Sequence, residues 1–244
     1  MNCYCEKHDF EYERKLYKLG SRTFATDCPK CQEERLEKQR QEGIKERKKI
    51  VEEQQKIARE LKLKAQNIEP EFYSATLDNY VAKTESQKKA LAAVKRLVNG
   101  EVKKVIMLGE NGVGKTHLGS AAVKIKDGKI MTAYEVSLHI RDGIAWGKEK
   151  ESLDELCSYS LLVIDEFGRT KMSDAEKNWH SYIFDKRHVR GLDTMITGNG
   201  HFHKDCSKGG CEKCLEAMLD NDTISRFCQN GIIMTVTGPD QRRI

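Results

Sequence analysis

The most informative segment of the chain is Gly109-Glu110-Asn111-Gly112-Val113-Gly114-Lys115-Thr116. It fits the pattern G-x4-G-K-[ST] at every position, and it lies between an apolar run at 105–108 and a helical pattern. In that setting backbone N–H groups surround phosphates, and the helix N-terminus adds partial positive charge. We therefore expect this loop to bind ATP, with Lys115 reaching the β- and γ-phosphates and Thr116 ligating Mg²⁺.

An acidic pair follows the next long apolar run. Residues 161–164 are all apolar, which indicates a buried strand, and Asp165 and Glu166 come directly after them. That strand would bring Asp165 beside the magnesium ion, and Glu166 is placed to polarise an attacking water. The second carboxylate favours hydrolysis of ATP over phosphoryl transfer to a metabolite. We expect Lys115, Asp165 and Glu166 to be catalytic.

Two further polar residues are candidates for the same reaction. The expected strand 195–197 is followed by Gly198 and Asn199, so Asn199 would end a strand near Asp165 and could hold the same water. Arg226 lies on an expected helix end, where it could complete the site of a neighbouring subunit and stabilise transition-state charge. Its spacing fits an ordinary surface arginine as well.

The chain from residue 71 onward alternates short apolar runs with helical patterns. This alternation is typical of an α/β fold with a parallel sheet covered on both faces. The expected strands are 105–108, 130–133, 161–164, 195–197 and 232–236, and the expected helices include 86–98, 115–124, 137–146 and 175–189.

The nine cysteines fall mainly into two groups, and their odd number in a chain we expect to be cytoplasmic favours metal binding over disulfides. The N-terminal group has the spacing of a tetrahedral zinc site. Cys3 is a fifth candidate for its four places, and Cys5 is favoured because it pairs with His8 at two-residue spacing. The four expected ligands are Cys5, His8, Cys28 and Cys31.

The second group lies within 200–215, between Asn199 and Arg226. Three cysteines and one histidine could close a second zinc site there, and a solvated loop with incidental cysteines explains the pattern equally well. His203 is the preferred fourth ligand over His201. The expected set is His203, Cys206, Cys211 and Cys214.

More than half of residues 32–66 are charged, with both signs present and no proline. This composition predicts a long solvated helix, which serves either as a spacer or as an arm that docks a partner. Pro70 ends the pattern. We expect three parts: a zinc-binding module at 1–33, a charged helical linker at 34–69, and an ATPase domain at 70–244.

The composition narrows the class of protein further. No run approaches the roughly 18 apolar residues of a membrane span, and the N-terminus lacks an apolar secretory signal, so we expect a cytoplasmic protein without membrane contact. The formal net charge of +5 comes from 43 basic and 38 acidic residues that are mixed along the chain. This balance permits nucleic-acid binding without requiring it.

Taken together, these motifs resemble the DnaC/IstB-like branch of the AAA+ ATPases, specifically the replicative helicase loaders of the DnaC and DnaI type. The resemblance covers about residues 70–244. It rests on the phosphate loop with His117 and Leu118, on 162–168, on 196–199, and on Ser225-Arg226-Phe227. Only 18 of the 244 residues follow Arg226, too few for the helical lid of many AAA+ proteins, as in the loader branch.

The resemblance implies a five-stranded parallel sheet, ATP-dependent self-assembly, and slow ATP hydrolysis regulated by DNA or a partner. It makes Asn199 the sensor residue, Arg226 the finger acting in trans, and His117 part of the nucleotide site. It implies a replicative hexameric helicase as the partner of the zinc module, as in Gram-positive and phage-type loaders. It also implies contact with single-stranded DNA, with Arg141 at a matching basic position.

The leading hypothesis is therefore an ATP-dependent loader of the replicative helicase onto single-stranded DNA. An IstB-like transposition accessory ATPase is the alternative within the ATPases, and the N-terminal zinc module favours the loader. A nucleotide-binding adaptor with negligible turnover is the alternative from another class, and Glu166 argues against it.

Overall fold

The computed structural model describes residues 1–241 and divides the chain into two compact units, Met1–Glu60 and a second unit that begins at Leu61. The first unit has almost no core. Cys28 is the one buried side chain among residues 1–60. Two antiparallel ribbons and most of a long helix make up this unit. They are β1 (Asn2–Cys5) with β2 (Phe10–Glu13), β3 (Leu16–Leu19) with β4 (Arg22–Ala25), and α1 (Pro29–Ala65).

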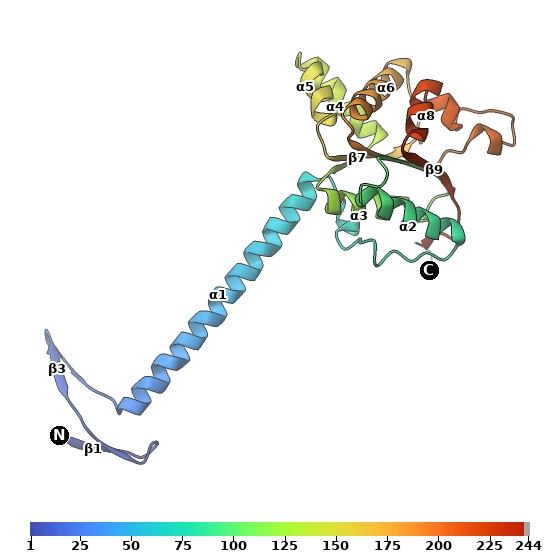
Figure 1. Ribbon diagram of the computed structural model, residues 1–244. Helices are drawn as coiled ribbons and strands as arrows, with labels where there is room; N and C mark the ends of the chain where they lie inside the picture. Colours follow the sequence, from blue (N-terminus) through green and yellow to red (C-terminus); the bar gives the residue numbers. More distant parts are fainter. Residues whose placement is uncertain (242–244) are drawn as a thin grey trace. The chain divides into compact units, whose positions relative to one another are not determined.

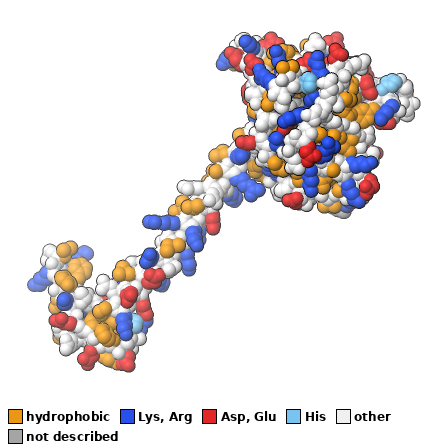
Figure 2. All heavy atoms as spheres, in the orientation of Figure 1, with side chains coloured by type: hydrophobic (Ala, Val, Ile, Leu, Met, Phe, Trp, Pro, Cys, Tyr) orange, Lys and Arg blue, Asp and Glu red, His pale blue; other side chains and the backbone are white. Residues whose placement is uncertain are grey.

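The helix α1 is the charged helix that the composition predicts, and it begins earlier than expected because Pro29 occupies its first turn. Side chains of both signs alternate along it (Figure 2), and residues 29–62 of the helix contain no buried side chain. The boundary between the compact units falls inside this helix rather than at Pro70. The reason is that Leu63 and Ile68 are buried in the core of the second unit.

The second unit contains the five-stranded parallel sheet that was expected (Figure 1). Its strand order is β6-β7-β8-β5-β9, so the strand before the phosphate loop lies between the last two strands of the chain. The strands are β5 (Lys104–Gly109), β6 (Lys129–Thr132), β7 (Leu161–Phe167), β8 (Asp193–Gly198) and β9 (Gly231–Val236).

Helices cover both faces of the sheet, as Figure 1 shows. Alternate residues of each strand point to opposite faces. Val105 and Met107 pack toward α2 (Glu85–Val98) and α3 (Lys115–Lys126), whereas Ile106 and Leu108 pack toward the helices of the other face. Those helices are α4 (Ala133–Ala145), α5 (Glu149–Leu156), α6 (Asp174–Val189), the short α7 (Leu215–Met218) and α8 (Asn221–Cys228).

Two elements differ from expectation. Helix α4 begins at Ala133, because Thr132 and Glu135 form a capping box that ends strand β6 there. Helix α5 was not expected, since its eight residues are mostly charged. Within residues 1–241 no α-helix follows β9. None of the helices in that range has the length and hydrophobicity needed to span a bilayer.

Candidate functional site

The loop between β5 and α3 has the backbone that a phosphate-binding loop requires. Gly109, Gly112 and Gly114 all have positive φ, at 139°, 78° and 90°. A Cβ on Gly109 would lie 2.0 Å from the backbone oxygen of Val236, so only glycine fits between β5 and β9. Tyr80 supports the loop from the other side, because its hydroxyl donates a hydrogen bond of 2.8 Å to the Val113 carbonyl.

The side chain of Lys115 reaches back to the start of this loop. Its ammonium donates hydrogen bonds to the carbonyls of Gly109 (2.9 Å) and Glu110 (2.6 Å) and to the side-chain oxygen of Asn199 (3.3 Å). Asn199 directly follows β8, the sheet neighbour of β5. The end of this strand therefore lies beside the phosphate loop.

The acidic pair lies at the end of β7. The Asp165 carboxylate accepts hydrogen bonds from the Thr197 hydroxyl and from the Glu166 N–H group, the latter at 2.8 Å. Glu166 has φ of 54°, and the register between β7 and β8 shifts around it. Its carboxylate forms an ion pair with Arg169. A non-glycine residue in the left-handed region is uncommon and is often found where a side chain must be aimed.

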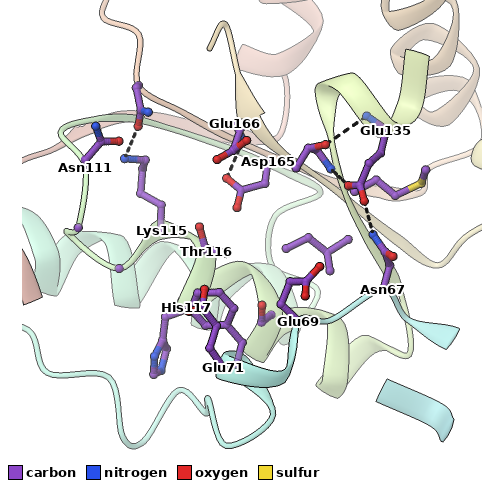
Figure 3. A pocket seen from close by; sticks show the side chains of 18 of the residues that line it. Asn67, Glu69, Glu71, Asn111, Lys115, Thr116, His117, Glu135, Asp165 and Glu166 are labelled. Atoms are coloured by element: carbon purple, nitrogen blue, oxygen red, sulfur yellow. Dashed lines mark hydrogen bonds between the residues drawn. The ribbon is translucent and has the colours of Figure 1, made fainter. Parts of the chain in front are cut away.

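These residues surround one cavity with a volume of about 460 Å³. Figure 3 shows Lys115, Thr116, Asp165 and Glu166 around it. These groups beside a glycine-rich loop fit a nucleoside triphosphate with its magnesium ion. The ammonium can pair with phosphate, and the hydroxyl and carboxylate oxygens can ligate the magnesium. The site residues expected from the sequence that line the cavity are Asn111, Gly112, Gly114, Lys115, Thr116, His117, Asp165, Glu166 and Asn199.

Other lining residues were not expected. Asn67, Glu69, Glu71 and Glu135 also face the cavity (Figure 3), and Asn67 donates a hydrogen bond of 3.3 Å to Glu135. They come from the segment before α2 and from α4, and no motif singles them out. Thr197 was missed as well, although a polar residue inside an otherwise apolar strand is a usable signal.

His117 lies on the first turn of α3. Its Nε2 is 2.9 Å from the carbonyl of Thr76, and its ring packs on Tyr80 with centroids 5.5 Å apart. It therefore connects α3 to the segment that precedes α2.

Arg226 is not among the residues that line the cavity of its own chain. It lies on α8 and forms an ion pair with Asp185 of α6. Arg141, the expected DNA contact, lies on α4 and forms an ion pair of 2.5 Å with Glu176. Both arginines are partly exposed and paired within the chain, so an external ligand would compete with an existing carboxylate.

The N-terminal cysteine cluster comes together as its spacing predicts. One donor atom from each of Cys5, His8, Cys28 and Cys31 lies within 4.8 Å of the others, and Cys3 is not part of this group. The Nδ1 atom of His8 lies 3.4–3.8 Å from the three sulfurs, while its Nε2 lies 3.0 Å from Glu34. A carboxylate on the far nitrogen is the arrangement that orients a zinc-bound histidine. The group could hold zinc.

The second cluster differs from the expectation in one ligand. His201, not His203, joins Cys206, Cys211 and Cys214, with donor atoms within 4.8 Å of one another. The choice of His203 is corrected because its backbone N–H is bound to Glu216 and its ring lies over Gly210. Backbone N–H groups of Lys208 and Gly210, together with His201, lower the pKa of Cys206 to about 6. The thiolate, which is the metal-binding form, is therefore favoured at neutral pH.

Comparison with known proteins bears on the identity of this site. A model of the family described as IstB-like ATP binding protein matches residues 23–237. The replicative helicase loader DnaC of Buchnera aphidicola subsp. Acyrthosiphon pisum is 30% identical over 148 residues, which is 56% of this chain and 60% of that protein. A putative ATP-binding protein of insertion sequence IS232 from Bacillus thuringiensis subsp. berliner is 23% identical over 143 residues, 57% of this chain and 55% of that protein. The chain thus spans less than two thirds of these relatives.

Solved structures show the same fold. The crystal structure of the DnaC helicase loader superposes with a TM-score of 0.59 at 24% identity and covers 69% of this chain and all of that one. The crystal structure of DnaI gives 0.54 at 19% identity, with 72% and 94% covered. These similarities confirm the expected α/β fold around a five-stranded parallel sheet.

Proposed function

The chain belongs to the family of IstB-like ATP-binding proteins, and from this premise we propose that it is an ATP-dependent loader of the replicative DNA helicase. It would bind the hexameric helicase, guide it onto single-stranded DNA, and release it on ATP hydrolysis. The setting would be the cytoplasm during initiation of replication. A curated relative described as a replicative helicase loader supports this choice.

The observation that carries the choice is the cluster of Cys5, His8, Cys28 and Cys31 in a unit separate from the nucleotide cavity. A unit whose one buried side chain is Cys28 cannot be stable through apolar burial, so metal binding would supply its folding energy. None of its residues lines the nucleotide cavity. A protein-docking role for residues 1–33, connected through a linker at 34–69 to the ATPase domain at 70–244, accounts for its presence.

The ATPase roles follow from the geometry of the cavity. Lys115 would neutralise the β- and γ-phosphates, and Thr116 and Asp165 would hold Mg²⁺, which polarises the phosphates when bound. Glu166 would orient the attacking water once its carboxylate leaves Arg169, and Asn199 would hold that water from the next strand. The pairing of Glu166 with Arg169 in the free chain supports slow hydrolysis that DNA or a partner accelerates.

Arg226 would act in trans. It does not line the nucleotide cavity of its own chain, and it is partly exposed on α8. In an oligomer it could therefore reach the phosphates bound by a neighbouring subunit, once its ion pair with Asp185 is broken. Arg141 would contact DNA phosphate after leaving Glu176, which would make that contact sensitive to salt.

A transposition accessory ATPase is the second candidate, because the chain also resembles the IS232 protein. The two functions differ in the partner that the first unit binds. Co-purification of the full chain with a hexameric replicative helicase, lost in Cys28→Ser/Cys31→Ser protein, supports the loader. Capture of a transposase with no retention of helicase would contradict it.

A further inference from the structure

We propose that His201, Cys206, Cys211 and Cys214 bind a second, structural zinc ion. One donor atom from each residue lies within 4.8 Å of the others. Three thiolates and one imidazole are a donor set that zinc binds in structural sites with tetrahedral geometry. The cluster lies in the segment between β8 and α8, inside the ATPase unit, and is independent of the N-terminal cluster.

The backbone already brings the two ends of this segment together. His201 and Cys214 form a parallel β-bridge, in which the His201 N–H donates to Lys213 (3.1 Å) and the Leu215 N–H donates to His201 (2.9 Å). The Cys211 N–H donates to the Cys214 sulfur at 3.3 Å, and the Cys211 sulfur lies 3.3 Å from the His201 ring. Two ligands are thus fixed by the fold, and a third is held against them.

The middle of the segment is held by short-range backbone hydrogen bonds and by two exposed polar contacts, His203 with Glu216 and Lys171 with Glu212. Residues 202–213 contain no buried side chain, and Gly209 and Gly210 both have positive φ. The chain nevertheless turns back so that Cys206 meets His201 and Cys214. Metal binding would supply the free energy that holds three cysteines and one histidine together in a segment with so few buried side chains.

The metal would connect two parts of the proposed ATPase site. Asn199 directly follows β8 and lies two residues before His201. Leu215 and Met218, just after Cys214, are buried in the core that also contains Phe227 of α8. We therefore infer that zinc holds the segment leading to Arg226 at a fixed distance from the strand end that carries Asn199. This consequence rests on the proposed function, but the metal site itself does not.

Zinc content measured by native mass spectrometry on the full chain tests the site. Wild-type protein should hold two zinc ions per chain, Cys28→Ser/Cys31→Ser protein one, and the same protein with His201→Ala none. His203→Ala in that background is the matched control and should keep its ion. One zinc in the wild type and none in Cys28→Ser/Cys31→Ser protein would overturn the proposal, as would retention of the ion after His201→Ala.

A second measurement uses only the wild-type protein, so its result does not depend on whether a variant folds. Alkylation of the wild type with iodoacetamide, followed by peptide mapping, should leave Cys206, Cys211 and Cys214 largely unmodified until a chelator is added. Cys228 is exposed and should react equally with and without chelator. Reaction of the three cysteines at the Cys228 rate in zinc-loaded protein would contradict the site. Loss of helicase binding alone would bear only on the proposed function.

Discussion

The ammonium of Lys115 donates a hydrogen bond to the side-chain oxygen of Asn199 across 3.3 Å. The two residues follow adjacent parallel strands, β5 and β8, whose carboxyl ends share one edge of the sheet. The contact joins the phosphate loop to the strand end that was expected to sense the nucleotide. It provides a direct path by which binding at the loop could change the position of Asn199.

Lys115→Ala should weaken ATP binding by about tenfold to a hundredfold. The reason is that hydrogen bonds to a charged group contribute about 1.5–3 kcal/mol, and each 1.4 kcal/mol is tenfold in affinity. Titration with a fluorescent ATP analogue measures this. Lys88→Ala, which removes an exposed lysine paired with Glu85 on α2, is the control and should bind normally. Equal affinities of the two variants would contradict the assignment of the loop.

Glu166→Gln should lower the rate of ATP hydrolysis by about 10²–10⁴-fold, the usual contribution of a general base. Nucleotide affinity should change little, because glutamine keeps the shape of the side chain. Single-turnover hydrolysis and equilibrium binding separate the two effects. Glu71→Gln removes another carboxylate that lines the same cavity and should hydrolyse at the wild-type rate. DNA-stimulated hydrolysis that survives Glu166→Gln would refute the role of Glu166.

Arg226→Ala should lower the hydrolysis rate by about 10³-fold or more if the arginine stabilises the transition state in trans. Mixing Arg226→Ala protein with Lys115→Ala protein should then restore part of the activity, because mixed assemblies contain some intact sites. Steady-state hydrolysis of the mixture measures this. Arg190→Ala, at another partly exposed arginine, should keep its activity. A mixture no more active than its separate components would exclude action in trans.

Cys28→Ser/Cys31→Ser should lose one zinc ion per chain while ATP affinity stays unchanged, because these ligands belong to the first compact unit. Cys3→Ser is the matched control. Cys3 lies on the same strand as Cys5 but outside the cluster, so this variant should keep its zinc. Elemental analysis measures the zinc content per chain, and titration of the same samples with nucleotide measures the ATP affinity. Zinc loss after Cys3→Ser would show that the wrong N-terminal cysteine has been assigned.

Much of the ATPase unit could be predicted because its signals are local. Runs such as Leu161–Ile164 indicate buried strands directly, and the glycine pattern at 109–114 specifies a backbone that few other residues allow. Asn199 could be placed because parallel strands end at one edge. All four residues of the N-terminal cluster and the three cysteines of the second cluster could be chosen from their spacing in the sequence.

The features that could not be predicted depend on contacts between distant segments. The choice between His201 and His203 is decided by the bridge between His201 and Cys214, which no spacing rule contains. The partner of Arg226, Asp185, depends on how α8 packs against α6. Helix α5 was missed because its mostly charged sequence carries a weak apolar pattern.

The proposed loader function is tested most directly by the loading of helicase onto circular single-stranded DNA, because this DNA has no ends onto which the helicase could thread spontaneously. Helicase retained on this DNA is measured with ATP, in the presence of wild-type chain, Lys115→Ala protein or no added protein. We expect severalfold more retained helicase with the wild-type chain than with no added protein, and no increase with Lys115→Ala protein. Equal retention under all three conditions would contradict it.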